Sequence, residues 1–219
     1  MWGYGGIGKR ENGKHSFILL DLSAAFDTIH RVVLLRTLRM EFGITGKALA
    51  WFRSYLTERH QSVKIGNIIS TQRNLHCGVP QGSVLGPKLF SLYTQPLQKV
   101  IQSSGMSFHL YADDTQLYMS FSPKCASSIN SKLRTVDSCT ASVGVWMRSH
   151  FLKLNNDKTE ILVITRPSLN SHNITSMNIC GSDIYISTTV KDLAVHYDSM
   201  LKMESHVKSI CKKAFYQSI

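Results

Sequence analysis

Tyr111-Ala112-Asp113-Asp114 places two adjacent carboxylates between two apolar, strand-like runs. Residues 106–111 and 115–121 alternate between apolar and polar side chains, which favours half-buried strands joined by a turn at the two aspartates. Turn chemistry explains one aspartate, because its side chain accepts hydrogen bonds from nearby backbone N–H groups. Two adjacent carboxylates repel each other unless a cation or a shared proton lies between them. The stretch therefore leaves two interpretations open, a simple turn and a metal site.

The composition is that of a globular, basic protein. Of the 219 residues, 43% are hydrophobic and 18% are charged, which is enough to bury a substantial core. The net charge of +11 indicates a polyanionic partner, nucleic acid first and a membrane surface second. Residues 31–73 hold eight lysines and arginines against Glu41 and Glu58. We interpret this stretch as a surface that binds phosphates beside a metal centre, the alternative being a solvated basic face.

Cysteines and apolar runs indicate the cellular compartment. The five cysteines are scattered and never closer than 14 residues, so neither zinc spacing nor a disulfide framework is present, and a reducing compartment is expected. The N-terminus lacks the order of a signal peptide, and no apolar run approaches membrane-spanning length. We expect a soluble, intracellular protein without a membrane partner.

The apolar patterns predict most of the secondary structure. The first expected helix places Val32, Leu35 and Leu38 on its buried face, and a later one begins at Pro87 and kinks at Pro96. In chain order we expect a loop at 1–16, a strand at 17–22, helices at 29–42 and 47–58, a hairpin within 61–76, a glycine-proline loop at 77–87 leading into a helix, the hairpin around Asp113, a helix at 126–150, a turn at 152–158, strands at 159–165, 177–186 and 190–197, and a basic helix at 202–218.

The order of these elements predicts an α+β fold. Strand, helices, strand, strand, helix, strand is the split βαβ arrangement, an antiparallel sheet with helices packed on one face. In that arrangement the first strand and the hairpin are neighbours, so Asp21 would lie beside Asp113 and Asp114. Three converging carboxylates supply the hard oxygen ligands that Mg²⁺ prefers. This favours the metal site over the simple turn.

Four stretches carry a resemblance to a known family. They are Leu20-Asp21-Leu22-Ser23-Ala24-Ala25-Phe26-Asp27-Thr28, Gly78-Val79-Pro80-Gln81-Gly82-Ser83-Val84-Leu85-Gly86-Pro87, Tyr111-Ala112-Asp113-Asp114-Thr115-Gln116-Leu117-Tyr118 and Leu152-Lys153-Leu154-Asn155-Asn156-Asp157-Lys158-Thr159-Glu160. They resemble motifs A, B, C and D of the reverse transcriptases of non-LTR (LINE-type) retrotransposons. Residues 190–195 are similar to the primer-gripping segment that follows, with Ala194 where the family usually has glycine. Group II intron maturases and other palm polymerases share the aspartate pair, but the sequences of motifs A and B in this chain resemble those of the retrotransposon enzymes more.

The resemblance implies a polymerase palm domain with a two-metal active site. Asp21, Asp113 and Asp114 would be catalytic and would hold two Mg²⁺ ions, with Mn²⁺ as a substitute and the Leu22 carbonyl as a further ligand. Lys158 would protonate the leaving pyrophosphate, although an exposed turn lysine can equally have no role.

The resemblance also implies a nucleotide site. Phe26 would be the steric gate against the ribose 2′-hydroxyl, the alternative being plain core packing. Gln81 and Gly82 would line the nucleotide and template site, together with Tyr111. Asp27 fits the pattern but is better interpreted as a helix cap than as a metal ligand.

The expected domains are an N-terminal loop at 1–16, the palm at 17–189, and a primer-grip strand with the start of a thumb helix at 190–219. We expect the fingers to be largely missing and the thumb truncated, and His30-Arg31 replaces the Asp-His that the family often shows. The first hypothesis is an RNA-directed DNA polymerase that uses an RNA template, a DNA primer and deoxynucleoside triphosphates, found in the nucleus and the cytoplasm. The second is a catalytically inactive, nucleic-acid-binding remnant of such an element. Enzymatic activity and oligomeric state stay open.

Overall fold

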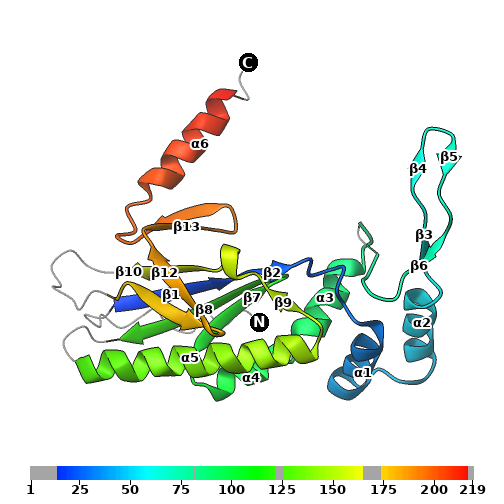
Figure 1. Ribbon diagram of the computed structural model, residues 1–219, viewed down its shortest axis with the longest axis horizontal. Coiled ribbons are helices and arrows are strands. Elements are labelled where there is room, and N and C mark those ends of the chain that lie inside the picture. The colour runs from blue at the N-terminus through cyan, green and yellow to red at the C-terminus, as the bar shows by residue number, and fades with distance from the viewer. Residues whose placement is uncertain (1–13, 81, 122–125, 165–173, 217–219) are drawn as a thin grey trace.

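A twisted sheet forms the centre of the computed structural model, which describes residues 14–80, 82–121, 126–164 and 174–216 (Figure 1). The strand order is β11-β12-β10-β1-β8-β7. The strands are β1 (Lys14–Leu20), β7 (Ser107–Tyr111), β8 (Asp114–Phe121), β10 (Glu160–Ile164), β11 (Ser176–Ile179) and β12 (Ser182–Ser187).

Strand β1 lies in the middle of the sheet. Ile18 and Leu20 share one face of the strand and are 0% and 2% exposed, whereas Phe17 and Leu19 on the other face are partly buried. β1 pairs antiparallel with β8 on one side and with β10 on the other. The expected pairing of the first strand with the aspartate hairpin is therefore confirmed. The sheet is antiparallel except at β10 and β12, which run parallel because the β11–β12 hairpin packs against β10 through its second strand.

Helices cover one face of the sheet. Figure 1 shows α4 (Leu97–Ser103) and α5 (Ala126–Ser149) lying along the same side of the strands. The side chains that α5 buries there include Val136, Val143 and Met147, whose helical spacing places them on one face of the helix. Helix α3 (Gly86–Thr94) ends just before Pro96, where α4 begins, so the predicted kink is a break between two helices.

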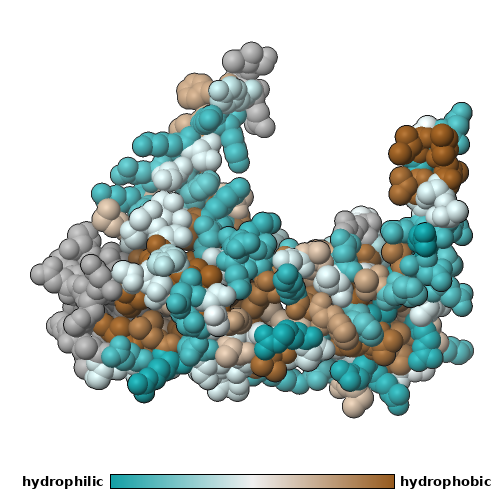
Figure 2. Space-filling model, viewed as in Figure 1, coloured by the Kyte–Doolittle hydropathy of each residue, from teal (hydrophilic) through white to brown (hydrophobic). Residues whose placement is uncertain are grey.

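Two projections rise from opposite ends of the sheet. At one end are α1 (Arg31–Phe42), α2 (Gly46–Leu56) and a long hairpin of β3 (His60–Gln61), β4 (Lys64–Ile65), β5 (Ile68–Ile69) and β6 (Arg73–Asn74). At the other end are β13 (Thr189–Asp192), β14 (Val195–Asp198) and α6 (Glu204–Tyr216). Figure 2 shows open space between the hairpin and α6, so the molecule is U-shaped in this view.

Two expectations for α1 were wrong. Val32 is 69% exposed, whereas Val33 and Leu34 are buried, because contacts with α2 and α3 set the rotation of the helix. Asp27 is not the helix cap, since α1 begins at Arg31 with His30 in the cap position.

Among the described helices, none is both long and apolar enough to cross a membrane.

Candidate active site

The aspartate pair lies at the tight turn between β7 and β8. Tyr111 pairs with Asp114, which leaves Ala112 and Asp113 as the two turn residues. Ala112 has φ +52°, in the left-handed region that two-residue hairpin turns use. Asp113 thus occupies the turn itself, and Asp114 is the first residue of β8.

Asp21 lies next to Asp114 because of the strand register. Leu20, the last residue of β1, pairs with Thr115. Asp21 follows Leu20 and Asp114 precedes Thr115, so the two aspartates lie opposite each other at the end of this antiparallel pair. Both aspartates line one small cavity of about 80 Å³, to which the 3₁₀ turn Asn156–Lys158 contributes Lys158. The cavity is lined by Leu19, Leu20, Asp21, Asp114, Thr115, Lys158, Glu160, Lys191, Asp192 and Leu193. The structure therefore brings Asp21, Asp114 and Lys158 together, although Asp21 and Lys158 are 137 positions apart in the sequence (158 − 21).

The surroundings of Asp114 disfavour its negative charge. Burial, and then the nearby charges of Asp113, Asp192 and Asp21, raise the pKa of Asp114 above its usual value. One side-chain oxygen of Asp21, Oδ2, is buried and has no hydrogen-bond partner among the described residues. A buried carboxylate oxygen without a partner is costly. Both observations favour a bound cation at this place.

The donor set suits Mg²⁺, although it is not a preformed cage. Within the described residues, no three histidine, cysteine, aspartate or glutamate side chains converge as a metal site. Mg²⁺ is usually bound by one or two carboxylates together with water and substrate phosphates, so it does not need such a cage. Leu22 lies next to Asp21, and the pairing of β2 (Leu22–Ser23) with β9 (Lys153–Leu154) holds its backbone.

The turn that carries Lys158 is tied to Asp21 through the backbone. The N–H of Asn155 donates to the Asp21 carbonyl at 2.9 Å, and the N–H of Lys158 donates to the Asn155 carbonyl at 3.2 Å. The Lys158 side chain is exposed at the mouth of the cavity. Its position relative to Asp21 is therefore set by two hydrogen bonds.

Asp192 is a member of the site that the sequence analysis missed. It is 9% exposed, and the Gln116 amide donates to both of its carboxylate oxygens, at 2.8 and 2.9 Å. Burial raises the pKa of Asp192, while the Gln116 hydrogen bonds and then the charge of His109 lower it, with a net rise. Tyr118 donates to the Gln116 side-chain oxygen at 2.9 Å and completes the network. In β13, Asp192 is in phase with the buried Val190, and this alternation was the signal in the sequence.

The predicted nucleotide-site residues that the structure describes lie outside the Asp21 cavity. The Phe26 ring is partly buried, with its centroid 4.8 Å from that of the fully buried Phe90, as core packing also predicts. Gly82 is exposed with φ +74°, and Tyr111 is 57% exposed at the end of β7. Gln81 lies outside the described residues. The Asp21 cavity contains neither Phe26, Gly82 nor Tyr111.

Motifs A and B are joined through their backbones. The N–H of Val79 donates to the Phe26 carbonyl at 3.2 Å, and the N–H of Gly78 donates to the Ile29 carbonyl at 2.8 Å. Gly78 has φ +80°, and a Cβ there would lie 3.2 Å from the Asp27 carbonyl oxygen. Only glycine fits this close approach without strain.

Arg31 fastens the segment that leads into motif B. Its guanidinium donates to the carbonyls of Leu75, Cys77 and Gly78, at 2.5, 3.0 and 3.2 Å. Arg31 is only 8% exposed. We call this arrangement the Arg31 clamp. It explains what an arginine does at the position where the family often has histidine.

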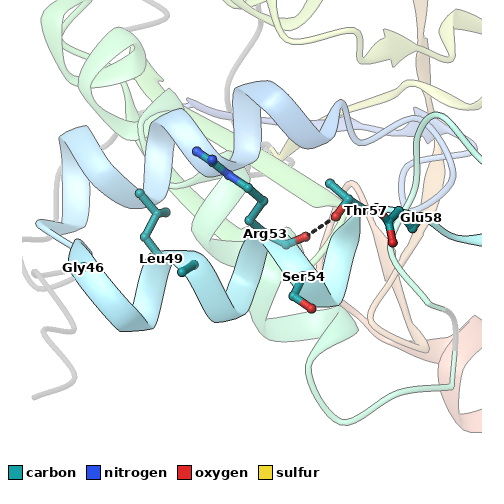
Figure 3. Close-up of a pocket in the computed structure, with 7 residues that line it drawn as sticks. Gly46, Leu49, Arg53, Ser54, Thr57 and Glu58 are labelled. Carbon is teal, nitrogen blue, oxygen red and sulfur yellow. Dashed lines mark hydrogen bonds between the residues drawn. The ribbon is translucent and has the colours of Figure 1, made fainter.

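A second depression, of about 410 Å³, lies on α2 and is lined by residues of that helix and the loop after it (Figure 3). Figure 3 shows Arg53 extending from the helix and its carbonyl accepting the Thr57 hydroxyl hydrogen bond, which is 2.8 Å long. None of the predicted catalytic or nucleotide-site residues lines it. It is shallow and open, so the Asp21 cavity remains the candidate active site.

Comparisons with known proteins found similar sequences. A family model described as reverse transcriptase (RNA-dependent DNA polymerase) matches residues 6–207. A probable RNA-directed DNA polymerase from transposon BS of Drosophila melanogaster is 26% identical over 203 residues, 90% of this chain and 22% of that protein. A probable RNA-directed DNA polymerase from transposon X-element of the same fly is 35% identical over 99 residues, 44% of this chain and 11% of that protein. The chain thus spans less than a quarter of the length of either relative.

Solved structures share the fold. Apo telomerase from Candida tropicalis, truncated from its C-terminal domain, superposes with a TM-score of 0.53 at 14% identity, covering 78% of this chain and 34% of that one. A second structure of apo telomerase from the same species gives a TM-score of 0.52 at 13% identity, covering 78% of this chain and 31% of that one. The palm-like α+β arrangement is therefore common to this chain and to both of these structures.

Proposed function

Because the chain belongs to the reverse transcriptase family of RNA-dependent DNA polymerases, we propose that the Asp21 cavity is the active site of an RNA-directed DNA polymerase of the non-LTR retrotransposon kind. One observation carries the proposal. Strand register brings Asp21 and Asp114 into one cavity, where a buried carboxylate oxygen has no partner among the described residues. The reaction is the addition of deoxynucleotides to the 3′ end of a DNA primer on an RNA template.

In this proposal Asp21, Asp113 and Asp114 hold the metal ions, with the Leu22 carbonyl as a further ligand. Two Mg²⁺ ions, or Mn²⁺, would lower the pKa of the primer 3′-hydroxyl and neutralise charge on the leaving pyrophosphate. Asp114 gains most from such binding, because burial and its acidic neighbours otherwise disfavour its charged form.

Lys158 donates a proton to the leaving pyrophosphate in this proposal. Lys158 is exposed and lines the cavity, which leaves it accessible to a triphosphate, and the hydrogen bonds through Asn155 fix the turn relative to Asp21. Lys191 lines the same cavity and adds a second positive charge for the triphosphate.

The nucleotide-site residues follow from motifs A, B and C. Phe26 would exclude a 2′-hydroxyl by its bulk, and its contact with Phe90 would hold the ring in place. Gly82 and Gln81 would contact the nucleotide and the template, and the exposed Tyr111 would contact the nucleotide. The net charge of +11 fits a polyanionic template and primer.

Primer extension on an RNA template tests the proposal. We expect Mg²⁺-dependent incorporation of deoxynucleotides, and a loss of at least about 100-fold in Asp113→Ala, the scale of a lost transition-state charge contact. Asp137→Ala, an exposed aspartate on α5, is the matched control and should extend normally. Activity that survives Asp113→Ala removes that residue from the site. Salt-sensitive RNA binding without incorporation under any metal supports the inactive, nucleic-acid-binding alternative instead.

For a chain of this family we propose a location in the nucleus and the cytoplasm. Imaging of a tagged chain tests this, and a signal confined to membranes contradicts it.

A further inference from the structure

Two stacked aromatic rings lie on α2, those of the exposed Trp51 and the partly buried Tyr55, and Arg59 just beyond the helix adds a guanidinium group. Trp51 and Tyr55 are four residues apart and therefore share one face of the helix. Their rings are stacked, with centroids 5.4 Å apart and planes 8° from parallel. The Arg59 guanidinium lies 5.0 Å from the Tyr55 ring centroid, and its Nε donates to the Tyr55 carbonyl at 2.9 Å. We call these three residues the Trp51 stack.

Tyr55 packs partly against the core, which helps to fix its ring, but the core does not include Trp51. The side of α2 that contacts the core carries Leu56, which is 1% exposed, with Leu49 and Phe52 partly buried. Trp51 is 53% exposed, although tryptophan offers more apolar surface to bury than any of these residues. A large ring held in a fixed orientation in solvent is what a planar ligand needs for stacking.

The surroundings of the stack are strongly basic. Residues 46–77 contain five lysines and arginines and one acidic residue, Glu58, for a net charge of +4 (5 − 1). The five are Lys47, Arg53, Arg59, Lys64 and Arg73. The ion pair that the described residues form, between Lys99 and Glu41, involves none of them. These cations are therefore available to phosphates.

We propose that the Trp51 stack and its basic neighbours bind single-stranded nucleic acid without sequence preference. An unpaired base stacks on the open face of Trp51, and the lysines and arginines contact the adjacent phosphates. The binding does not use the aspartates of the Asp21 cavity. The proposal rests on the proposed function only for the identity of the strand, which would be unpaired template RNA.

The charge argues for this occupant over a second copy of the chain, because two surfaces of +4 repel each other. The position in the fold agrees with it as well. Figure 1 shows α2 at the base of the long hairpin, at the end of the molecule away from α6, and Lys64 and Arg73 continue the basic surface along that hairpin. A strand lying on α2 would therefore run alongside a second row of cations.

Fluorescence anisotropy of a labelled 20-nucleotide oligouridylate, with the whole chain, tests the proposal. Trp51→Ala should weaken binding about 5- to 150-fold, the range for loss of one base-stacking ring. Trp51→Phe should restore part of the affinity, because it keeps an aromatic face. Tyr185→Ala removes a ring that is 75% exposed on β12 and is the matched control, with unchanged binding expected. A melting temperature equal to that of the native chain would show that the fold of each variant is intact.

Further arms separate the alternatives. Lys47→Gln, four residues before Trp51 and therefore on the same face of α2, should weaken binding to all sequences and reduce the slope of log affinity against log salt by about 1. A fully paired RNA duplex should compete poorly, and equal competition overturns the stacking mechanism. Equal affinity of Trp51→Ala and the native chain, or a change in its sedimentation instead of its RNA affinity, overturns the proposal. Asp113→Ala should bind normally, so loss of catalysis and loss of this surface are distinguishable.

Discussion

The Arg31 clamp can be tested by one substitution, since a single side chain holds three carbonyls of the segment before motif B. Arg31→Met keeps most of the side-chain volume and removes all three hydrogen bonds. Hydrogen bonds from a charged donor contribute about 1.5–3 kcal/mol each, so the gross loss is about 4.5–9 kcal/mol.

The net loss should be smaller because water reaches part of the site. Cys77 is exposed and Leu75 half-buried, so their carbonyls can bond to solvent in the variant, whereas Gly78 is buried. An unsatisfied buried carbonyl costs about 1–3 kcal/mol, and we expect a total near 3 kcal/mol. For a chain of this size each kcal/mol lowers the melting temperature by about 2–4 °C, which gives a decrease of about 6–12 °C.

Thermal unfolding followed by circular dichroism measures this change. Arg36→Met is the control, because Arg36 is exposed on the same helix, and it should cost less than about 0.5 kcal/mol. Arg31→Lys should resemble the methionine variant more than the native chain, since an ammonium cannot reproduce the planar guanidinium fork. Equal melting temperatures for the Arg31→Met and Arg36→Met variants would refute the clamp.

Three further predictions concern the site and its supports. Because the folded-state pKa of Asp114 is raised, the folded chain binds that proton more tightly than the unfolded chain, and stability falls as pH rises from the usual value of 3.8 through the folded pKa. Asp114→Asn should therefore melt higher than the native chain at pH 7 without divalent metal and equally at pH 3; a lower melting temperature at pH 7 would contradict this. Asp192→Asn removes a charge that raises the pKa of Asp114. The acid limb of the plot of primer-extension activity against pH should therefore move to lower pH, and an unchanged acid limb would exclude that coupling. Gly78→Ala should lose about 1–2 kcal/mol more in urea unfolding than Gly105→Ala, which has φ +71° but open space around it; equal losses would mean that the contact with Asp27 is relaxed at little cost.

Patterns within single segments of the sequence predicted the turns, the helix interruption and the buried face of the longest helix. The turn at Asp113 follows from backbone chemistry and the buried line on α5 from helical spacing, while the expected kink at Pro96 is a break between two helices. The rotation of α1 does not follow in the same way. Four apolar residues in a row, Val32 to Leu35, satisfy more than one buried face, and only the contacts with α2 and α3 select Val33 and Leu34.

The candidate site shows the same division. Asp21 and Asp114 could be placed together because the split βαβ order makes their strands neighbours, and the register bears this out. Asp192 was missed because its partner Gln116 is 76 residues away, on a strand of a different hairpin. Nothing in either segment alone specifies that pairing. Alternation with Val190 marks Asp192 as buried, but burial does not identify the group that compensates it.

The central position of β1 has a consequence for synthesis of the chain on the ribosome. Leu19 pairs with Gln116 and Glu160, which follow it by 97 and 141 residues (116 − 19 and 160 − 19). At about 5–20 residues per second, the second partner is made about 7–28 s after β1. β1 has neither neighbour until Gln116 is made and only one until Glu160 is made, so at least one of its edges is unpaired throughout that interval. Because unpaired edges favour aggregation, we expect the nascent chain to depend on chaperones until residue 164 has been made.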